Sequence, residues 1–183
     1  IARVFKEILG VEVKTPFLRM PYKEAMERFG SDKPDTRFGL EICNITDAVK
    51  DSGFKVFADA AKNGGSVRAI NAKGLGKDIS RKNIDALGEF VKTYKAKGLA
   101  WIRYNDDGIA SPIAKFLSDD EMGKIVELTN CEKGDVIFIV ADKDSVVFDS
   151  LGALRCEIAK QHGLIDKNKF NLLWVTEFPL LEY

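Results

Sequence analysis

The longest uninterrupted apolar stretch of the sequence, Val136–Ala141, constrains the fold more than any other feature. It follows Asp135 and predicts the strongest β-strand of the chain, because a short apolar run between polar residues is typical of a buried strand. The run is far shorter than the ~18 apolar residues that a helix needs to cross a bilayer. We therefore expect a chain that folds around a buried strand and has no membrane partner.

Turn and capping residues divide the remaining sequence into short strands and amphipathic helices. Asn63-Gly64-Gly65 predicts a β-hairpin between strands at Phe54–Ala58 and Ser66–Asn71. Ser80 predicts an N-cap, and the apolar residues that follow it at spacings of three, three, one and three predict an amphipathic helix. Further expected elements are extended chain at 12–22, strands at 99–104, 109–117 and 170–178, helices at 22–29 and 145–161, a helix opening at the capping box 118–121, and a short helix or turn at 42–52.

The order of these elements indicates an α+β fold. The middle of the chain runs strand–strand–helix–strand–strand–helix–strand–helix with short connections, which predicts an antiparallel β-sheet covered by helices on one face. A length of 183 residues fits one domain with small flanking pieces. The chain begins at Ile1 rather than at a Met, and both ends look cut from something longer.

Charge and cysteine content narrow the possible partners and compartment. The 28 Lys and Arg residues are balanced by 28 Asp and Glu residues, which argues against a strong, sequence-independent grip on nucleic acid but leaves room for a local basic face. The three cysteines, Cys43, Cys131 and Cys156, are odd in number and far apart, which is typical of a reducing cytosol. Residues 1–6 carry charge where a secretory signal needs an apolar core. We expect a cytoplasmic protein.

Three motifs invite chemical interpretations that their spacing does not support. Lys73–Asp78 has a glycine and lysine pair like that of a phosphate loop, but Asn71 stands where the first glycine is needed and Asp78 where a hydroxyl residue should follow the lysine. Cys156 and His162 lie six residues apart on one helix and do not share a face, so we expect no metal site. Leu154–Glu157 resembles the Phe-Arg-x-Glu signature of nucleotide-activating ligases, yet it falls in the middle of a helix, where Cys156 is expected to be partly buried.

Three stretches carry motifs that belong together. The first is Met20–Met26, followed by Phe-Gly-Ser-Asp-Lys-Pro-Asp within Phe29–Gly39. The third is Leu-Trp-Val-Thr-Glu-Phe-Pro-Leu at Leu173–Leu180. The second, middle stretch comprises residues 96–102, 111–117, 134–135 and 151–155. In this order and combination the chain resembles bacterial-type aspartyl-tRNA synthetases of class II over almost its whole length, with Glu177 where the family often has Asp.

The resemblance implies three parts. Residues 1–41 would be a catalytic-domain segment, residues 42–165 a GAD insertion domain between class II motifs two and three, and residues 166–183 a returning catalytic-domain strand. A related domain occurs in a subunit of glutamyl-tRNA amidotransferase, and that origin remains an alternative. It is the weaker one, because the Gly30–Asp35 loop and the Trp174–Pro179 strand are expected of the synthetase flanks.

The resemblance also implies an activity for the parent enzyme. That enzyme activates L-aspartate with ATP and magnesium, transfers it to tRNA, and is expected to be a homodimer. The family's arginines of motifs two and three, its His-His-Pro-Phe stretch and its anticodon-binding barrel do not occur in this sequence. We therefore expect no catalytic residue, no cofactor and no adenylate formation in this segment alone.

Two sets of residues are candidates for binding. The first is a polar loop that would line the active-site entrance or meet tRNA, or would instead be a structural turn held by a pair between Asp35 and Arg37. The second is a basic cluster that would contact the tRNA backbone; the alternative for this cluster is a solvated helix face. For the insertion as a whole, the alternative to tRNA binding is a structural or protein-interaction role. The loop residues are Ser31, Asp32, Lys33, Asp35 and Arg37. The basic residues are Arg68, Lys73, Lys77, Arg81 and Lys82.

Overall fold

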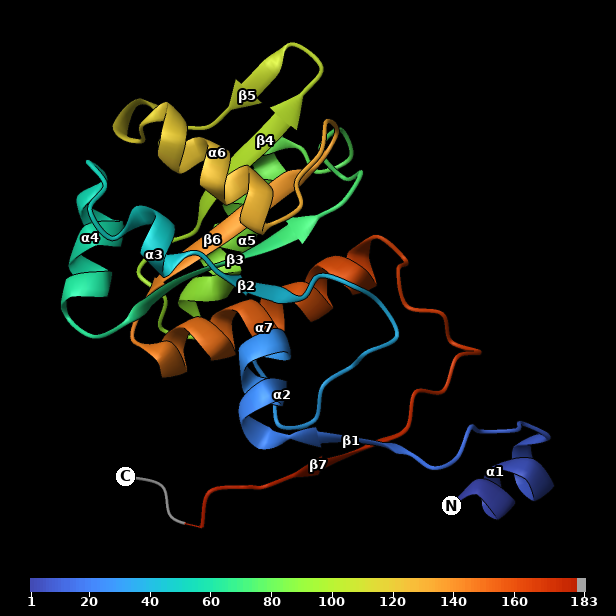
Figure 1. Ribbon diagram of the computed structural model, residues 1–183. Coiled ribbons are helices and arrows are strands. Elements are labelled where there is room, and N and C mark those ends of the chain that lie inside the picture. Colours follow the sequence, from blue (N-terminus) through green and yellow to red (C-terminus); the bar gives the residue numbers. More distant parts are fainter. Residues whose placement is uncertain (181–183) are drawn as a thin grey trace.

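A five-stranded antiparallel sheet in the order β2-β3-β6-β4-β5 forms the centre of the computed structural model, which describes residues 1–180 (Figure 1). The apolar run forms β6 in the middle of the sheet, paired with β3 from Ala72↔Val136 to Ser66↔Asp142 and with β4 on its other side. The prediction of a buried strand at this run is confirmed. The strands are β2 (Ile42–Asn44), β3 (Ser66–Ala72), β4 (Ala100–Asn105), β5 (Gly108–Ala110) and β6 (Val136–Asp142).

Helices pack on both faces of this sheet. Val136, Phe138 and Val140 of β6 lie in one core cluster with α5 (Arg81–Lys92) and α7 (Asp144–Gln161). The alternate residues Ile137 and Ile139 lie in a second cluster on the opposite face, which α3, α4 and α6 cover. The α+β class and the antiparallel sheet are confirmed, but the cover differs from the expected single face. The physical reason is that β6 has no polar alternation, so both of its faces must be buried. The helices of the second face are α3 (Thr46–Val49), α4 (Lys55–Lys62) and α6 (Asp119–Leu128).

The expected hairpin at Asn63–Gly65 is wrong. The preceding residues form the helix α4, and Asn63 is its C-cap before the chain enters β3. Phe57 is buried on one face of α4, and its ring meets that of Phe54 edge-on at 4.8 Å. Phe54, Phe57 and the alanines that follow are compatible with a helical face as well as with strand alternation, so the short pattern was ambiguous.

Two other boundaries also moved. Residues 42–52 divide into β2 and the one-turn helix α3. The strand expected over 109–117 is only β5, after which Pro112 cannot donate to a ladder and a 3₁₀ turn, η1 (Ala114–Phe116), follows. Both expected helix starts are confirmed, since Ser80 and Ser118 form capping boxes with Asn83 and Glu121.

The two flanks of the chain meet outside the main sheet. Strands β1 (Leu18–Pro21) and β7 (Leu173–Thr176) pair in parallel, and α2 (Tyr22–Phe29) follows β1 directly, whereas α1 (Ala2–Leu9) precedes it (Figure 1). None of the helices described is long and apolar enough to span a membrane. The division of the chain at 41/42 and 165/166 stays a prediction. The last three residues of the predicted part 166–183 lie outside the described residues.

Candidate functional site

The connection between α2 and β2 starts where two backbones touch. Gly30 ends α2 with a φ of 63°, and its N–H donates to the carbonyl of Met26 at 2.8 Å. A Cβ on Gly30 would lie 2.9 Å from the Cα of Gly152 in α7, and a Cβ on Gly152 would lie 2.9 Å from the carbonyl carbon of Gly30. No side chain fits at either position, so the two glycines let the end of α2 approach α7 closely.

A single buried side chain of α7 holds the loop that follows. Arg155 is 1% exposed, and its guanidinium donates from Nε to the carbonyl of Leu40 at 3.2 Å. Its second terminal nitrogen donates to the carbonyls of Asp35 and Gly39, each at 3.0 Å. One side chain therefore ties together three main-chain groups that lie 115 to 120 residues away in the sequence.

Aromatic faces surround the same guanidinium. Its carbon lies 4.4 Å from the ring centre of Phe38 and 5.0 Å from that of Phe29. Within residues 1–180 no carboxylate lies at ion-pair distance from Arg155, so carbonyl oxygens and π-faces stabilise its charge. Burial lowers the pKa of Arg155. Sequence reasoning missed this residue, although its place four residues after Leu151, on the apolar stripe of the helix, was a usable signal.

The predicted loop residues pair mostly with one another. The Arg37 guanidinium grips Asp35 with two parallel contacts, Nε to Oδ1 at 2.9 Å and a terminal nitrogen to Oδ2 at 2.7 Å. This pairing lowers the pKa of Asp35. Lys33 contacts Asp32 at 2.8 Å, and the Ser31 hydroxyl accepts from the Lys33 N–H at 3.2 Å. The five residues thus contact their loop neighbours in the arrangement expected of a structural turn. A role of the loop in binding a ligand stays a prediction.

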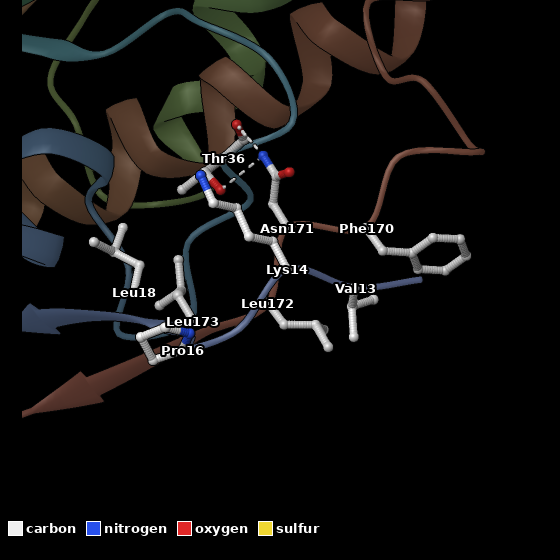
Figure 2. Close-up of a pocket in the computed structure, with 9 residues that line it drawn as sticks. All are labelled: Val13, Lys14, Pro16, Leu18, Thr36, Phe170, Asn171, Leu172 and Leu173. Atoms are coloured by element: carbon white, nitrogen blue, oxygen red, sulfur yellow. Dashed lines mark hydrogen bonds between the residues drawn. The ribbon is translucent and has the colours of Figure 1, made fainter. Parts of the chain in front are cut away.

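The returning flank borders the loop. The Asn171 side-chain amide donates to the carbonyl of Thr36 at 3.0 Å and contacts its hydroxyl at 3.3 Å, as Figure 2 shows. Beside this bridge lies an open hollow of about 370 Å³. Its walls are mostly apolar, and Lys14 adds a charged side chain to them. The residues that line it are Val13, Lys14, Pro16, Leu18, Thr36, Phe170, Asn171, Leu172 and Leu173.

The structure separates Arg68 from the other candidate basic residues. Arg68 lies in β3, is 7% exposed, and stacks its guanidinium 4.6 Å from the ring centre of Phe148. Its Nε donates to the Ser66 hydroxyl at 3.1 Å. Period-two alternation predicts this placement, because Arg68 shares a face of the strand with the buried Ile70. Packing against α7 is what this side chain does in the structure.

The remaining four basic residues lie on the β3–α5 connection and the first turn of α5. Lys77 contacts Asp106 of the β4–β5 turn at 3.3 Å, and Arg81 contacts Asp85 at 3.3 Å. Lys73 and Lys82 are exposed and form no ion pair with any other described residue. The surface therefore carries two unpaired cations beside two neutralised ones, a modest positive field.

The titratable groups elsewhere offer little chemistry. Burial raises the pKa of the Cys131 thiol to about 12, which keeps it protonated and unreactive. Cys156 is exposed rather than partly buried, because it faces away from the stripe that contains Leu154 and Ile158. In the part of the chain that the structure describes, no three His, Cys, Asp or Glu side chains gather as metal ligands would.

Comparison with known proteins places this geometry in a family. The family model described as the GAD domain matches residues 57–151, just over half of the chain. The chain belongs to the GAD domain family.

Its relatives give a more particular likeness. Over 184 residues the chain is 63% identical to an aspartate–tRNA ligase of Clostridium botulinum (strain Eklund 17B / Type B) and 62% identical to that of Clostridium beijerinckii. It is 59% identical to the aspartate–tRNA ligase of Clostridium perfringens (strain 13 / Type A). Each alignment covers the whole chain but only 31% of the relative. The resemblance seen in the motifs is confirmed, flanks included.

Proposed function

We propose that this chain is part of an aspartate–tRNA ligase, comprising the GAD insertion and the catalytic-domain segments on either side of it. The observation that carries the proposal is the 63% identity to a Clostridium botulinum aspartate–tRNA ligase across the entire chain. The parent enzyme would join L-aspartate to ATP as aspartyl-adenylate, releasing pyrophosphate, and then transfer the aspartyl group to a ribose hydroxyl at the 3′ end of tRNA. Its expected setting is the cytoplasm, and its expected state a homodimer.

The segment's own contribution would be to shape the parent rather than to react. Magnesium and ATP belong to the proposed reaction of the parent enzyme, and we assign neither of them a site in this segment. Catalysis by this class of chemistry depends on charges that stabilise a phosphoryl transition state. We propose that, of the elements of this chain, the loop Ser31–Arg37 lies nearest to the active site of the parent enzyme.

A specific observation favours a structural role for the insertion over a direct grip on tRNA. Of the five basic candidates, Arg68 is buried and two others are neutralised by Asp85 and Asp106. The contact of Gly30 with α7 instead fixes the insertion to its flank. An origin in an amidotransferase subunit has less support, because the relatives that match the flanks as well are ligases.

A chimaera tests the proposed activity. In the Clostridium botulinum relative, the matching 31% is replaced by this chain, and aspartate-dependent ATP–pyrophosphate exchange and tRNA aspartylation are measured. We expect activity within about tenfold of the unmodified ligase, because uniform packing of homologous pieces preserves the geometry that catalysis requires. A folded, dimeric chimaera without exchange activity would contradict the proposal. Robust exchange by the isolated chain would contradict its expected inactivity.

A second assay separates the two roles of the insertion. Binding of the isolated chain to tRNA specific for aspartate and to an unrelated tRNA is measured across a salt series, with Lys73→Ala/Lys82→Ala as the matched variant. Phosphate contacts predict affinity that falls steeply with salt and a slope reduced by about two in the double variant. Binding without preference would indicate general electrostatics only, and no binding would leave the structural role.

A further inference from the structure

The loop between α2 and β2 has almost no main-chain support of its own. Among the backbone–backbone hydrogen bonds of the described residues, none involves residues 31–41. Leu40 moreover has a φ of 62°, a left-handed conformation that a non-glycine residue adopts at a cost. Something outside the loop must hold it in this conformation.

Apart from the paired contacts of Arg28 with Glu41 at the end of the loop, the side-chain ties from outside converge on one residue. Four loop carbonyls accept hydrogen bonds from distant side chains, and Arg155 supplies three of them. One of its acceptors is the carbonyl of the strained Leu40. The fourth tie is the exposed Asn171, which reaches only Thr36. A planar guanidinium spans three acceptors at once, whereas an ammonium is a compact point charge.

We propose that Arg155 is a positioning residue: from the helix α7 it fixes the conformation of the loop between α2 and β2, residues 31–41, and through that loop the GAD domain supports the substrate site of the parent ligase. The catalytic half of this statement rests on the proposed function; the conformational half does not. Arg155 reaches no surface from which it could touch a substrate, so its effect must pass through the loop.

Limited proteolysis of this chain tests the conformational half. The Arg37–Phe38 bond is a trypsin site inside the loop, whereas Lys33 precedes a proline and is not cut. Arg155→Met should raise the rate of cleavage after Arg37 at least tenfold under native conditions, followed by mass spectrometry of the fragment that ends there. Arg155→Lys should raise it by a smaller factor, and it keeps the proposal testable if the methionine variant does not fold.

The matched control is Ile125→Ala. Ile125 is fully buried in α6 on the opposite face of the sheet, in the core cluster that contains no loop residue. The Ile125→Ala substitution should lower the free energy of unfolding. At temperatures well below the unfolding transition, the rate of cleavage after Arg37 should be the same in this variant and in the wild type. Cleavage after Arg37 that is equally slow in wild type and in both Arg155 variants would overturn the proposal.

Kinetics of the chimaeric ligase test the catalytic half. Arg155→Met should lower kcat/KM for L-aspartate in pyrophosphate exchange by about 10²-fold, since small misplacements of site elements cost this much. Arg155→Lys should restore part of the loss, and Ile125→Ala should leave kcat and KM unchanged. Equal kcat/KM in all variants would refute the catalytic role. An inactive wild-type chimaera would instead refute the proposed function, and proteolysis would still decide what Arg155 does to the loop.

Discussion

Replacing Gly152 by alanine tests how closely the flank and α7 approach each other. By helix propensity alone, Ala in the interior of a helix should stabilise it by about 1 kcal/mol relative to Gly. At position 152, however, the new methyl group would lie 2.9 Å from the carbonyl carbon of Gly30 and 3.0 Å from the oxygen of Phe29. Both are backbone atoms, which cannot rotate away, and overpacking of this kind typically costs about 1–3 kcal/mol.

The two effects have opposite signs, so a matched variant separates them. Gly88 lies in the interior of α5, and a Cβ there meets nothing within 4 Å. Gly88→Ala should therefore raise the free energy of unfolding by about 0.5–1 kcal/mol. We expect Gly152→Ala to lower it by about 2 kcal/mol, because a clash with three backbone atoms puts the overpacking cost near the top of its range, about 3 kcal/mol, and the propensity gain offsets about 1 kcal/mol of it.

Urea denaturation and thermal unfolding measure this difference. For a chain of this size each kcal/mol corresponds to a shift in Tm of about 2–4 °C. The variants should therefore move to opposite sides of the wild type, with near-identical denaturant slopes. A Gly152→Ala protein as stable as Gly88→Ala would refute the reasoning, because it would mean that α2 is not seated against α7 in solution.

Three further predictions concern other contacts. Asp135 is buried and accepts from Asn71 at 2.9 Å and from the N–H of Gly74 at 2.7 Å, so Asp135→Ala should cost about 3 kcal/mol in urea denaturation, and a loss below 1 kcal/mol would contradict this. Ser118→Ala should cost about 1 kcal/mol through loss of the α6 cap, with the exposed Ser145→Ala as a neutral control. Arg37 lowers the pKa of Asp35, so the pair stabilises the fold above the unfolded pKa of about 4, and that stability is lost as pH falls through the lower folded pKa. The difference in unfolding free energy between wild type and Asp35→Asn should therefore shrink below about pH 4. A difference that does not change with pH would contradict this.

Elements with a long, unambiguous period were predictable from the sequence. The helix α7 and the strands β3 and β6 appear close to where periodicity placed them, and both serine caps formed. The helix α4 was missed because a short stretch with phenylalanines at positions 54 and 57 fits a strand and a helix equally. The second layer of helices was missed although the unbroken run of β6 already implied burial on both faces.

The candidate site shows a different limit. Turn-forming residues predicted the loop Ser31–Arg37 and, as one of two alternatives, its internal pair of Asp35 and Arg37, because these are local features. Arg155, which holds the connection between α2 and β2 through the carbonyls of residues 35, 39 and 40, is 115 to 120 positions away, and no spacing rule connects it to them. Arg68, by contrast, lies in a strand that is buried along its whole length, so its place in β3 already implies burial, and alternation puts it on the face that α7 covers.

The parallel pairing of β1 with β7 limits how the stretch between these strands can be re-engineered. The chain leaves β1 at Pro21, beside Thr176, but it enters β7 at Leu173, beside Leu18, so exit and return lie at opposite ends of the strand pair. Parallel neighbours require a crossover of about a dozen residues or more, so a tight turn cannot replace the stretch. A homologous stretch can be exchanged as a whole, whereas any shortened version needs a linker that runs back along the length of both strands.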